Sequence, residues 1–120
     1  MKPRTQVVSV HPYFKVHPGK VAEFQAILPD MIAKVAAEPG TLAYEIGANG
    51  DEFMFREAYD GAAGWQSHMA NTDPIVARLL QVATVRRLEI HGPAQELDKL
   101  RAQVSAMNPV WYIRETGVWK

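Results

Sequence analysis

The spacing of hydrophobic residues changes several times along the chain, and each change predicts a boundary between secondary-structure elements. Residues 6–16 (QVVSVHPYFKV) are rich in Val, Tyr and Phe, which favours a strand; the proline inside it indicates a bulge or an edge position. Residues 20–38 come after a Pro-Gly turn and repeat apolar side chains at helical spacing. We therefore expect a helix there, kinked or broken at Pro29.

The middle of the chain predicts a hairpin followed by two helices. Residues 41–48 and 52–59 alternate apolar and polar positions on either side of an Asn-Gly-Asp turn, which is typical of a β-hairpin. Asp60 can cap a helix that ends at residue 71. Thr72 can cap a second helix that ends at residue 82.

The C-terminal third predicts one more strand at residues 85–91, a helix at 94–106 and a final strand at 110–119. The helix has charged side chains on most of its faces, as a solvated surface helix would. A Gly-Pro pair separates it from the strand before it.

This order of elements predicts an α+β fold: a ferredoxin-like split βαβ antiparallel sheet with helices on one face. We expect a single domain over residues 1–120, with a core at about 6–93 and an extension at about 94–120. The first strand is apolar on both faces, with Val8 and Val10 on one and Val7 and Tyr13 on the other. An exposed apolar sheet face favours a homodimer formed through that face.

The composition excludes several classes of function. Thirteen basic residues balance thirteen acidic ones, so no basic surface for nucleic acid or anionic lipid is expected. The chain has no cysteine, which excludes disulfides, thiolate metal ligands and cysteine nucleophiles. The apolar run near the N-terminus is too short for a signal peptide or a membrane span, so we expect a cytoplasmic protein. There is also no Gly-rich phosphate loop and no nucleophile elbow.

The candidate chemistry is concentrated in the segment GWQSHMAN, residues 64–71, which brings Trp65, His68 and Met69 close together on a helix. His68 is either a core histidine bonded to Glu57 or Tyr44, or a base that faces a pocket. Glu57 lies on an apolar strand face, where a carboxylate needs a partner; it either orients His68 or forms a structural ion pair. Both interpretations stay open for each residue.

Other aromatic side chains have the same two interpretations. The Tyr44 phenol can bond a substrate oxygen, and Phe55 and Trp65 can stack on an aromatic substrate, but all three residues are also suited to a core. The remaining histidines, His11, His17 and His91, are expected to be structural or solvent-facing. His11 and His17 share no metal-ligand spacing with a nearby pair of carboxylates, and we expect no metal.

Four segments, FKVHPGKVAEF, EPGTLAYEI, FMFREAYDGAAGWQSHMAN and LEIHGP, occur in this order over about residues 6–93. The chain thereby resembles the antibiotic biosynthesis monooxygenase superfamily, whose members are small dimeric α+β barrel proteins. The stretch with Trp111, Tyr112 and Trp119 is less typical of that superfamily.

The resemblance implies a cofactor-independent monooxygenase that acts on a small aromatic or quinol substrate with O₂. Catalysis would fall to His68 as the base and Glu57 as its orienting carboxylate. The pocket lining would comprise Tyr44, Phe55, Trp65 and Met69. Two alternatives remain: a dimeric module that binds a small ligand without turnover, and an isomerase of the same superfamily.

Overall fold

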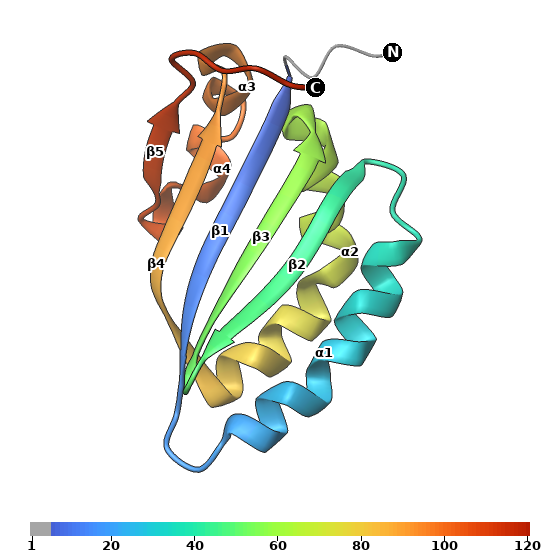
Figure 1. Ribbon diagram of the computed structural model, residues 1–120, viewed down its shortest axis with the longest axis vertical. Coiled ribbons are helices and arrows are strands. Elements are labelled where there is room, and N and C mark those ends of the chain that lie inside the picture. Colours follow the sequence, from blue (N-terminus) through green and yellow to red (C-terminus); the bar gives the residue numbers. More distant parts are fainter. Residues whose placement is uncertain (1–5) are drawn as a thin grey trace.

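The computed structural model describes residues 6–120, which form a five-stranded sheet with helices packed on one face (Figure 1). The expected ferredoxin-like α+β fold is confirmed. Along the chain the elements are β1 Val7–Val16, α1 Val21–Ala36, β2 Thr41–Asn49, β3 Glu52–Asp60, α2 Gly61–Val82, β4 Ala83–Gly92, α3 Ala94–Asp98, α4 Arg101–Val104, the 3₁₀ turn η1 Ser105–Met107 and β5 Val110–Ile113.

The sheet has the strand order β2-β3-β1-β4-β5, so β1 lies at its centre. Neighbouring strands are antiparallel except β4 and β5, which are parallel. The bulge expected in β1 is present, as a shift in the pairing with β4 between Tyr13 and Phe14, next to Pro12. The alternative expectation, an edge position for this strand, is wrong.

The two helices expected at residues 60–71 and 72–82 are one helix, α2, that continues through Pro74. Thr72 caps nothing: its hydroxyl donates to the backbone carbonyl of His68 one turn earlier (2.9 Å). A buried stripe that includes His68, Thr72, Ile75 and Leu79 continues across the junction, and its packing outweighs the local preference for a break. In the same way, α1 continues through Pro29, so the expected break there is wrong.

The start of α2 also differs from the expectation. Asp60 occupies the N-cap position, but its side chain makes no capping hydrogen bond in the described structure. The backbone N–H of Ala62 instead donates to Glu96 Oε1 at 2.9 Å. The cap of this helix therefore comes from the C-terminal segment.

The C-terminal segment differs from the solvated helix that its charge pattern predicts: it packs against the core, and it is divided into shorter elements. The single solvated helix expected at 94–106 is divided into α3, α4 and η1. Leu97, Leu100 and Val104 are fully buried, because these short helices pack over β1 and β4. The last strand ends at Ile113, since β4, its neighbour, ends at the paired Gly92.

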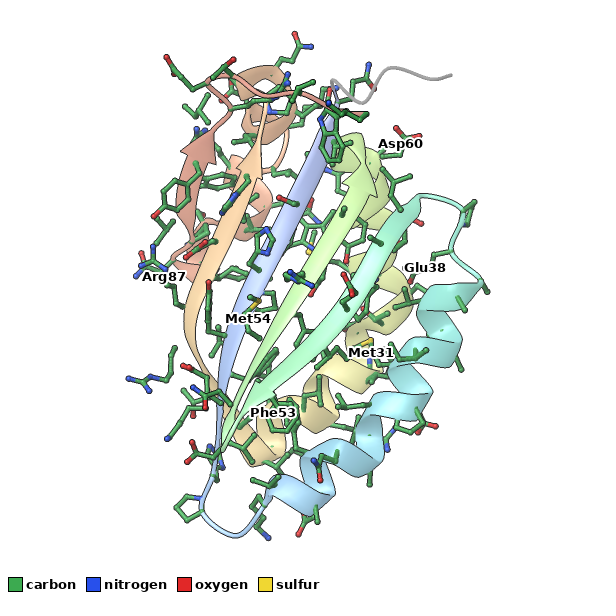
Figure 2. The ribbon with its side chains drawn as sticks, in the orientation of Figure 1. Met31, Glu38, Phe53, Met54, Asp60 and Arg87 are labelled. Atoms are coloured by element: carbon green, nitrogen blue, oxygen red, sulfur yellow. The ribbon has the colours of Figure 1, made fainter. Side chains whose placement is uncertain are left out.

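Alternation along the strands separates a covered and an open face of the sheet. Phe53 and Met31 are buried between the sheet and the helices, whereas Met54 and Arg87 lie outside this core (Figure 2). Aromatic rings of Phe14, Phe24 and Phe55 pack against one another in the covered layer, with centroids 5.0 to 6.5 Å apart. Within residues 6–120, no helix has the length and apolar character needed to cross a membrane.

Candidate functional site

A cavity of about 380 Å³ lies between α2 and the covered face of the sheet. This volume is in the range of pockets that hold small organic molecules. Most of its wall is apolar, and Met107 of η1 contributes to it, so the C-terminal segment helps to enclose the space. The structure brings all the residues predicted for the site to this one cavity: His68, Glu57, Tyr44, Phe55, Trp65 and Met69.

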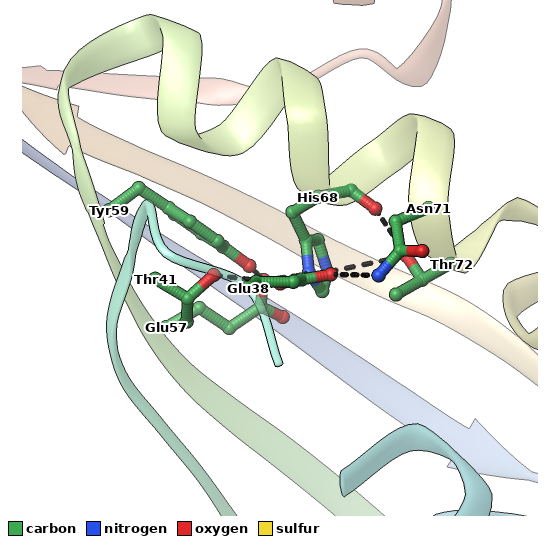
Figure 3. Close-up of polar contacts among 7 residues, drawn as sticks. All are labelled: Glu38, Thr41, Glu57, Tyr59, His68, Asn71 and Thr72. Atoms are coloured by element: carbon green, nitrogen blue, oxygen red, sulfur yellow. Dashed lines mark hydrogen bonds and ion pairs between the residues drawn. The ribbon is translucent and has the colours of Figure 1, made fainter. Parts of the chain in front are cut away.

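His68 is held by a buried hydrogen-bond network centred on Glu38 (Figure 3). The Nδ1 atom of His68 lies 2.8 Å from Glu38 Oε1, which also accepts a hydrogen bond from Thr41 Oγ1 at 2.7 Å. The other oxygen, Oε2, accepts from the side-chain amide of Asn71 at 2.7 Å. Burial alone would raise the pKa of Glu38, but these three hydrogen bonds together lower it. Glu38 is therefore an ionised acceptor.

The protonation state of His68 follows from this partner. An ionised carboxylate can only accept, so the Nδ1 atom of His68 carries the proton. Burial lowers the pKa of His68, and the hydrogen bond and charge of Glu38 offset part of that shift. The ring is thus neutral near pH 7, with the lone pair on Nε2. The hydroxyl of Thr72 lies 3.4 Å from Nε2 but points its hydrogen at the His68 carbonyl.

Glu57 lies on the other side of the same ring and does not orient it. Its Oε1 atom is 3.9 Å from His68 Nε2 and accepts a hydrogen bond from the Tyr59 hydroxyl. The expected hydrogen bond between Glu57 and His68 is absent from the described structure, because the turn after α1 brings Glu38 to Nδ1. Glu57 projects from β3 toward the opposite nitrogen.

The pKa of Glu57 is raised to about 8. Burial is the main cause, and the negative charge of Glu38 adds to it, while the hydrogen bond from Tyr59 acts in the opposite direction. At neutral pH the cavity wall therefore contains a carboxylic acid next to a neutral imidazole. This pair can donate a proton at one atom and accept one at the other.

Tyr44 faces the same cavity with a free hydroxyl. Its ring packs edge-on against Phe55, with centroids 5.8 Å apart, and lies 5.4 Å from the His68 ring. Within residues 6–120 its hydroxyl has no hydrogen-bond partner. Burial, with the nearby Glu57 and Glu38, raises the pKa of this hydroxyl, so it remains an uncharged donor. Phe55 and Trp65 are almost fully buried and form rigid walls.

Glu38 is the side chain of the candidate site that sequence reasoning missed. In the sequence, Glu38-Pro39-Gly40 indicates the end of a helix and does not indicate a buried carboxylate. The sequence does contain one signal for this contact: a glycine in the turn that carries Glu38 and another in the helix that carries His68. Gly40 and Gly64 pack backbone to backbone, and a Cβ on Gly64 would come within 2.6 Å of the Gly40 carbonyl oxygen. This contact brings the turn with Glu38 against α2.

The other histidines lie away from the cavity. His17 Nε2 is 3.1 Å from the hydroxyl of Thr84. His11 and His91 pack on the open face of the sheet, with ring centroids 4.6 Å apart. Across residues 6–120, no cluster of three or more His, Cys, Asp or Glu side chains could hold a metal ion.

Comparison with known proteins gives one family and a set of related structures. The sequence profile of the family described as antibiotic biosynthesis monooxygenase matches residues 7–73. MupZ from Pseudomonas fluorescens is 31% identical, with a TM-score of 0.93 over 100% of this chain and 94% of MupZ. Its alignment includes the C-terminal segment. No match is found among curated proteins.

Two further structures are similar over a smaller part of the chain. A putative antibiotic biosynthesis monooxygenase from Caulobacter crescentus is 25% identical, with a TM-score of 0.65 over 72% of this chain and 88% of the other. SnoaB, a cofactor-independent oxygenase from Streptomyces nogalater, is 17% identical, with a TM-score of 0.63 over 71% of this chain and 90% of SnoaB. At that identity SnoaB supports the fold alone.

Proposed function

Because the chain belongs to the antibiotic biosynthesis monooxygenase family, we propose that it is a cofactor-independent oxygenase of a small phenolic or quinol substrate. The observation that carries the proposal is His68: a buried, neutral imidazole whose Nε2 lies at a largely apolar cavity. A group of this kind can remove the proton of a phenol and leave an electron-rich phenolate in a site with little water.

For a phenol that carries hydrogen on the carbon para to its hydroxyl, the reaction we propose needs only the substrate and O₂. The phenolate transfers an electron to O₂, and the two radicals combine at the ring carbon para to the hydroxyl. One oxygen atom stays on that carbon as a carbonyl, so a phenol becomes a quinone. The other leaves as water with the two hydrogens that the phenol loses, one from O–H and one from C–H. Glu57, which holds a proton, can protonate the departing oxygen.

The cavity walls support an aromatic substrate. Trp65 and Phe55 offer flat apolar surfaces, and Tyr44 offers a hydroxyl for a substrate oxygen. The fold is also used by SnoaB, a cofactor-independent oxygenase, which is compatible with this chemistry in a barrel of this type.

We also propose that the chain forms a homodimer through the open face of the sheet. None of the helices within residues 6–120 covers this face, where Tyr13 is half buried and a hollow of about 340 Å³ lies beside Met54. The face is more polar than Val7 and Tyr13 alone indicate, because Ser9, His11 and Lys15 lie on it as well. Sedimentation equilibrium should give twice the 13.4 kDa chain mass, and Met54→Arg should shift it toward the monomer.

The oxygenase proposal is tested by O₂ consumption with 1-naphthol, in which the carbon para to the hydroxyl carries a hydrogen. His68→Ala should reduce the enzyme-dependent rate by about 100-fold or more, the usual worth of a general base. His17→Ala, a surface histidine, is the matched control and should leave the rate unchanged. Unchanged O₂ uptake in His68→Ala would reject the role of this residue. Binding of the aromatic compound without its consumption would favour a ligand-binding module.

A further inference from the structure

The cavity contains a proton donor and a proton acceptor side by side, and this arrangement has a use that does not involve oxygen. Oε1 of Glu57 and Nε2 of His68 are 3.9 Å apart, too far for a hydrogen bond to each other. Neither group is therefore engaged by the other, and the Glu57 carboxyl group, which also accepts from Tyr59, and the Nε2 lone pair can contact neighbouring atoms of one molecule in the cavity. The Tyr44 hydroxyl, free of any partner in residues 6–120, lies at the same wall.

We infer that this cavity also catalyses proton transfer at a carbon next to a carbonyl group, in an uncharged ketone or enone, without oxygen or a cofactor. His68 would be the base toward the carbon. Glu57 would be the acid toward the carbonyl oxygen. The inference uses the same side chains as the proposed oxygenase function but does not depend on it.

The proton and electron balance closes within the substrate and these two residues. His68 Nε2 takes a proton from the α-carbon, and the electron pair of that C–H bond forms a C=C bond. The carbonyl π pair then takes the proton of Glu57, which gives an enol, an imidazolium and a carboxylate. Returning both protons regenerates the ketone, with hydrogen exchanged at the α-carbon. Returning the carbon proton to the γ-carbon of an enone shifts its double bond.

The surrounding contacts stabilise the imidazolium of His68 and the carboxylate of Glu57 that are present while the substrate is an enol. Glu38 accepts the Nδ1–H of His68 and is ionised, so it stabilises the imidazolium. Tyr59 donates to Glu57 and so stabilises the carboxylate left after the acid has given up its proton. Burial also raises the pKa of Glu57 to about 8, so this carboxyl group is protonated at neutral pH and can donate its proton.

The lining residues define the class of substrate. No lysine or arginine belongs to the described cavity wall, and the charged or ionisable side chains there are Glu57, His68, Asp73 and Tyr44. A carboxylate or phosphate group would have no cationic partner and would face Asp73. The cavity therefore favours an uncharged molecule with one carbonyl oxygen and an apolar body.

The test is deuterium exchange of 2-tetralone in D₂O under argon, followed by proton NMR. The wild-type protein should accelerate loss of the α-hydrogen signals over buffer. His68→Ala should reduce the enzyme-dependent rate by about 100-fold or more, and Glu57→Gln by about 10-fold or more. The isosteric Glu57→Gln keeps an acceptor for Tyr59, and circular dichroism checks its fold. Glu23→Gln, on the exposed side of α1, is the control and should match the wild type.

The pH dependence gives a second measurement. The exchange rate should fall as pH rises through about 8, because Glu57 loses its proton. That fall should be absent in Glu57→Gln, whatever the residual rate. Exchange no faster than in buffer would overturn the inference even if O₂ uptake with a phenol is intact. Exchange without O₂ uptake would support it while rejecting the oxygenase proposal.

Discussion

At the scale of single residues, the site depends on two carboxyl groups in different protonation states. Glu38 receives three hydrogen bonds and is ionised, whereas Glu57 receives one from Tyr59 and keeps its proton. His68 lies between them and has one nitrogen facing each. The ionised carboxylate fixes the tautomer of the ring, and the neutral acid shares the cavity with its lone pair.

Replacing Glu38 by Gln should lower the pKa of His68, because the carboxylate both bonds the ring and carries the charge that raises this pKa. NMR titration of the His68 ring measures the shift directly. The acid limb of the pH–rate profile should move to lower pH with it, and the rate should fall by about 10-fold as the imidazolium loses its partner. An unshifted His68 titration would show that Glu38 acts only as packing; Glu45→Gln is the surface control.

Glu57 should make the protein less stable as pH rises. Its folded-state pKa of about 8 lies above the ordinary value of 4.5, so its contribution is complete below 4.5 and is lost as pH rises toward 8. Within that window the slope is at most about 1.4 kcal/mol per pH unit. Urea unfolding at several pH values should show this decline in the wild type and a flatter curve in Glu57→Gln. Parallel curves for the two proteins would contradict the assigned protonation state.

At the scale of elements, the approach of the turn after α1 to α2 determines whether the site forms. Gly64 lies on α2 near the helix start, and the Gly40 backbone packs directly on it. The backbone N–H of Asp60 also donates to the Gly40 carbonyl at 2.9 Å. Only glycine leaves room for two backbones this close. The contact sets the distance between Glu38, in the turn after α1, and His68, one turn beyond Gly64.

Gly64→Ala should therefore destabilise the protein by about 1–3 kcal/mol, because its Cβ would lie 2.6 Å from a backbone oxygen that cannot move freely. It should also weaken the Glu38–His68 hydrogen bond, which the His68 NMR titration reports. Gly47→Ala is a matched control, since a Cβ there meets only the Met54 carbonyl at 4.0 Å. Equal stability of the two variants would rule out a tight contact at Gly64.

At the scale of the whole molecule, the C-terminal segment packs into the same hydrophobic core as β1 and β4. Glu96 is buried and accepts from the Ala62 N–H at 2.9 Å and from Lys99 Nζ at 2.7 Å. It thereby joins α3 to the first turn of α2, the helix that carries His68. Met107, farther along the same segment, contributes to the cavity wall. The segment therefore holds the start of the helix that carries His68 and also contributes to the wall of the cavity.

Glu96→Ala should cost about 1–3 kcal/mol of unfolding free energy, because it leaves the buried Ala62 N–H without an acceptor. Glu96→Gln retains an oxygen and should lose less. Thermal or urea unfolding measures both, with the exposed Glu45→Ala as the reference. A loss in Glu96→Ala no greater than in the reference would mean that α3 does not stabilise α2.

Periodicity by itself determined the four main strands and the helix-covered face, since apolar spacing fixes which face of each element is buried. The six side chains predicted for the site came from the resemblance to the family, and all six lie at the cavity. The continuity of α2 could not be predicted from Thr72 and Pro74, because tertiary packing of the stripe across them outweighs their local preference. The burial of α3 and α4 could not be predicted either, because their charged residues indicate a solvated helix and only tertiary packing buries their apolar side chains.

The partner of His68 was decided only by the tertiary structure. Glu38 and Glu57 are both glutamates near apolar segments in the sequence, and Glu57 is closer to His68 along the chain. The Gly40–Gly64 contact brings Glu38 to Nδ1, and burial on β3 leaves Glu57 protonated beside Nε2. Protonation depends on the full environment of a group, including its burial and every hydrogen bond it receives, and local sequence carries none of that information.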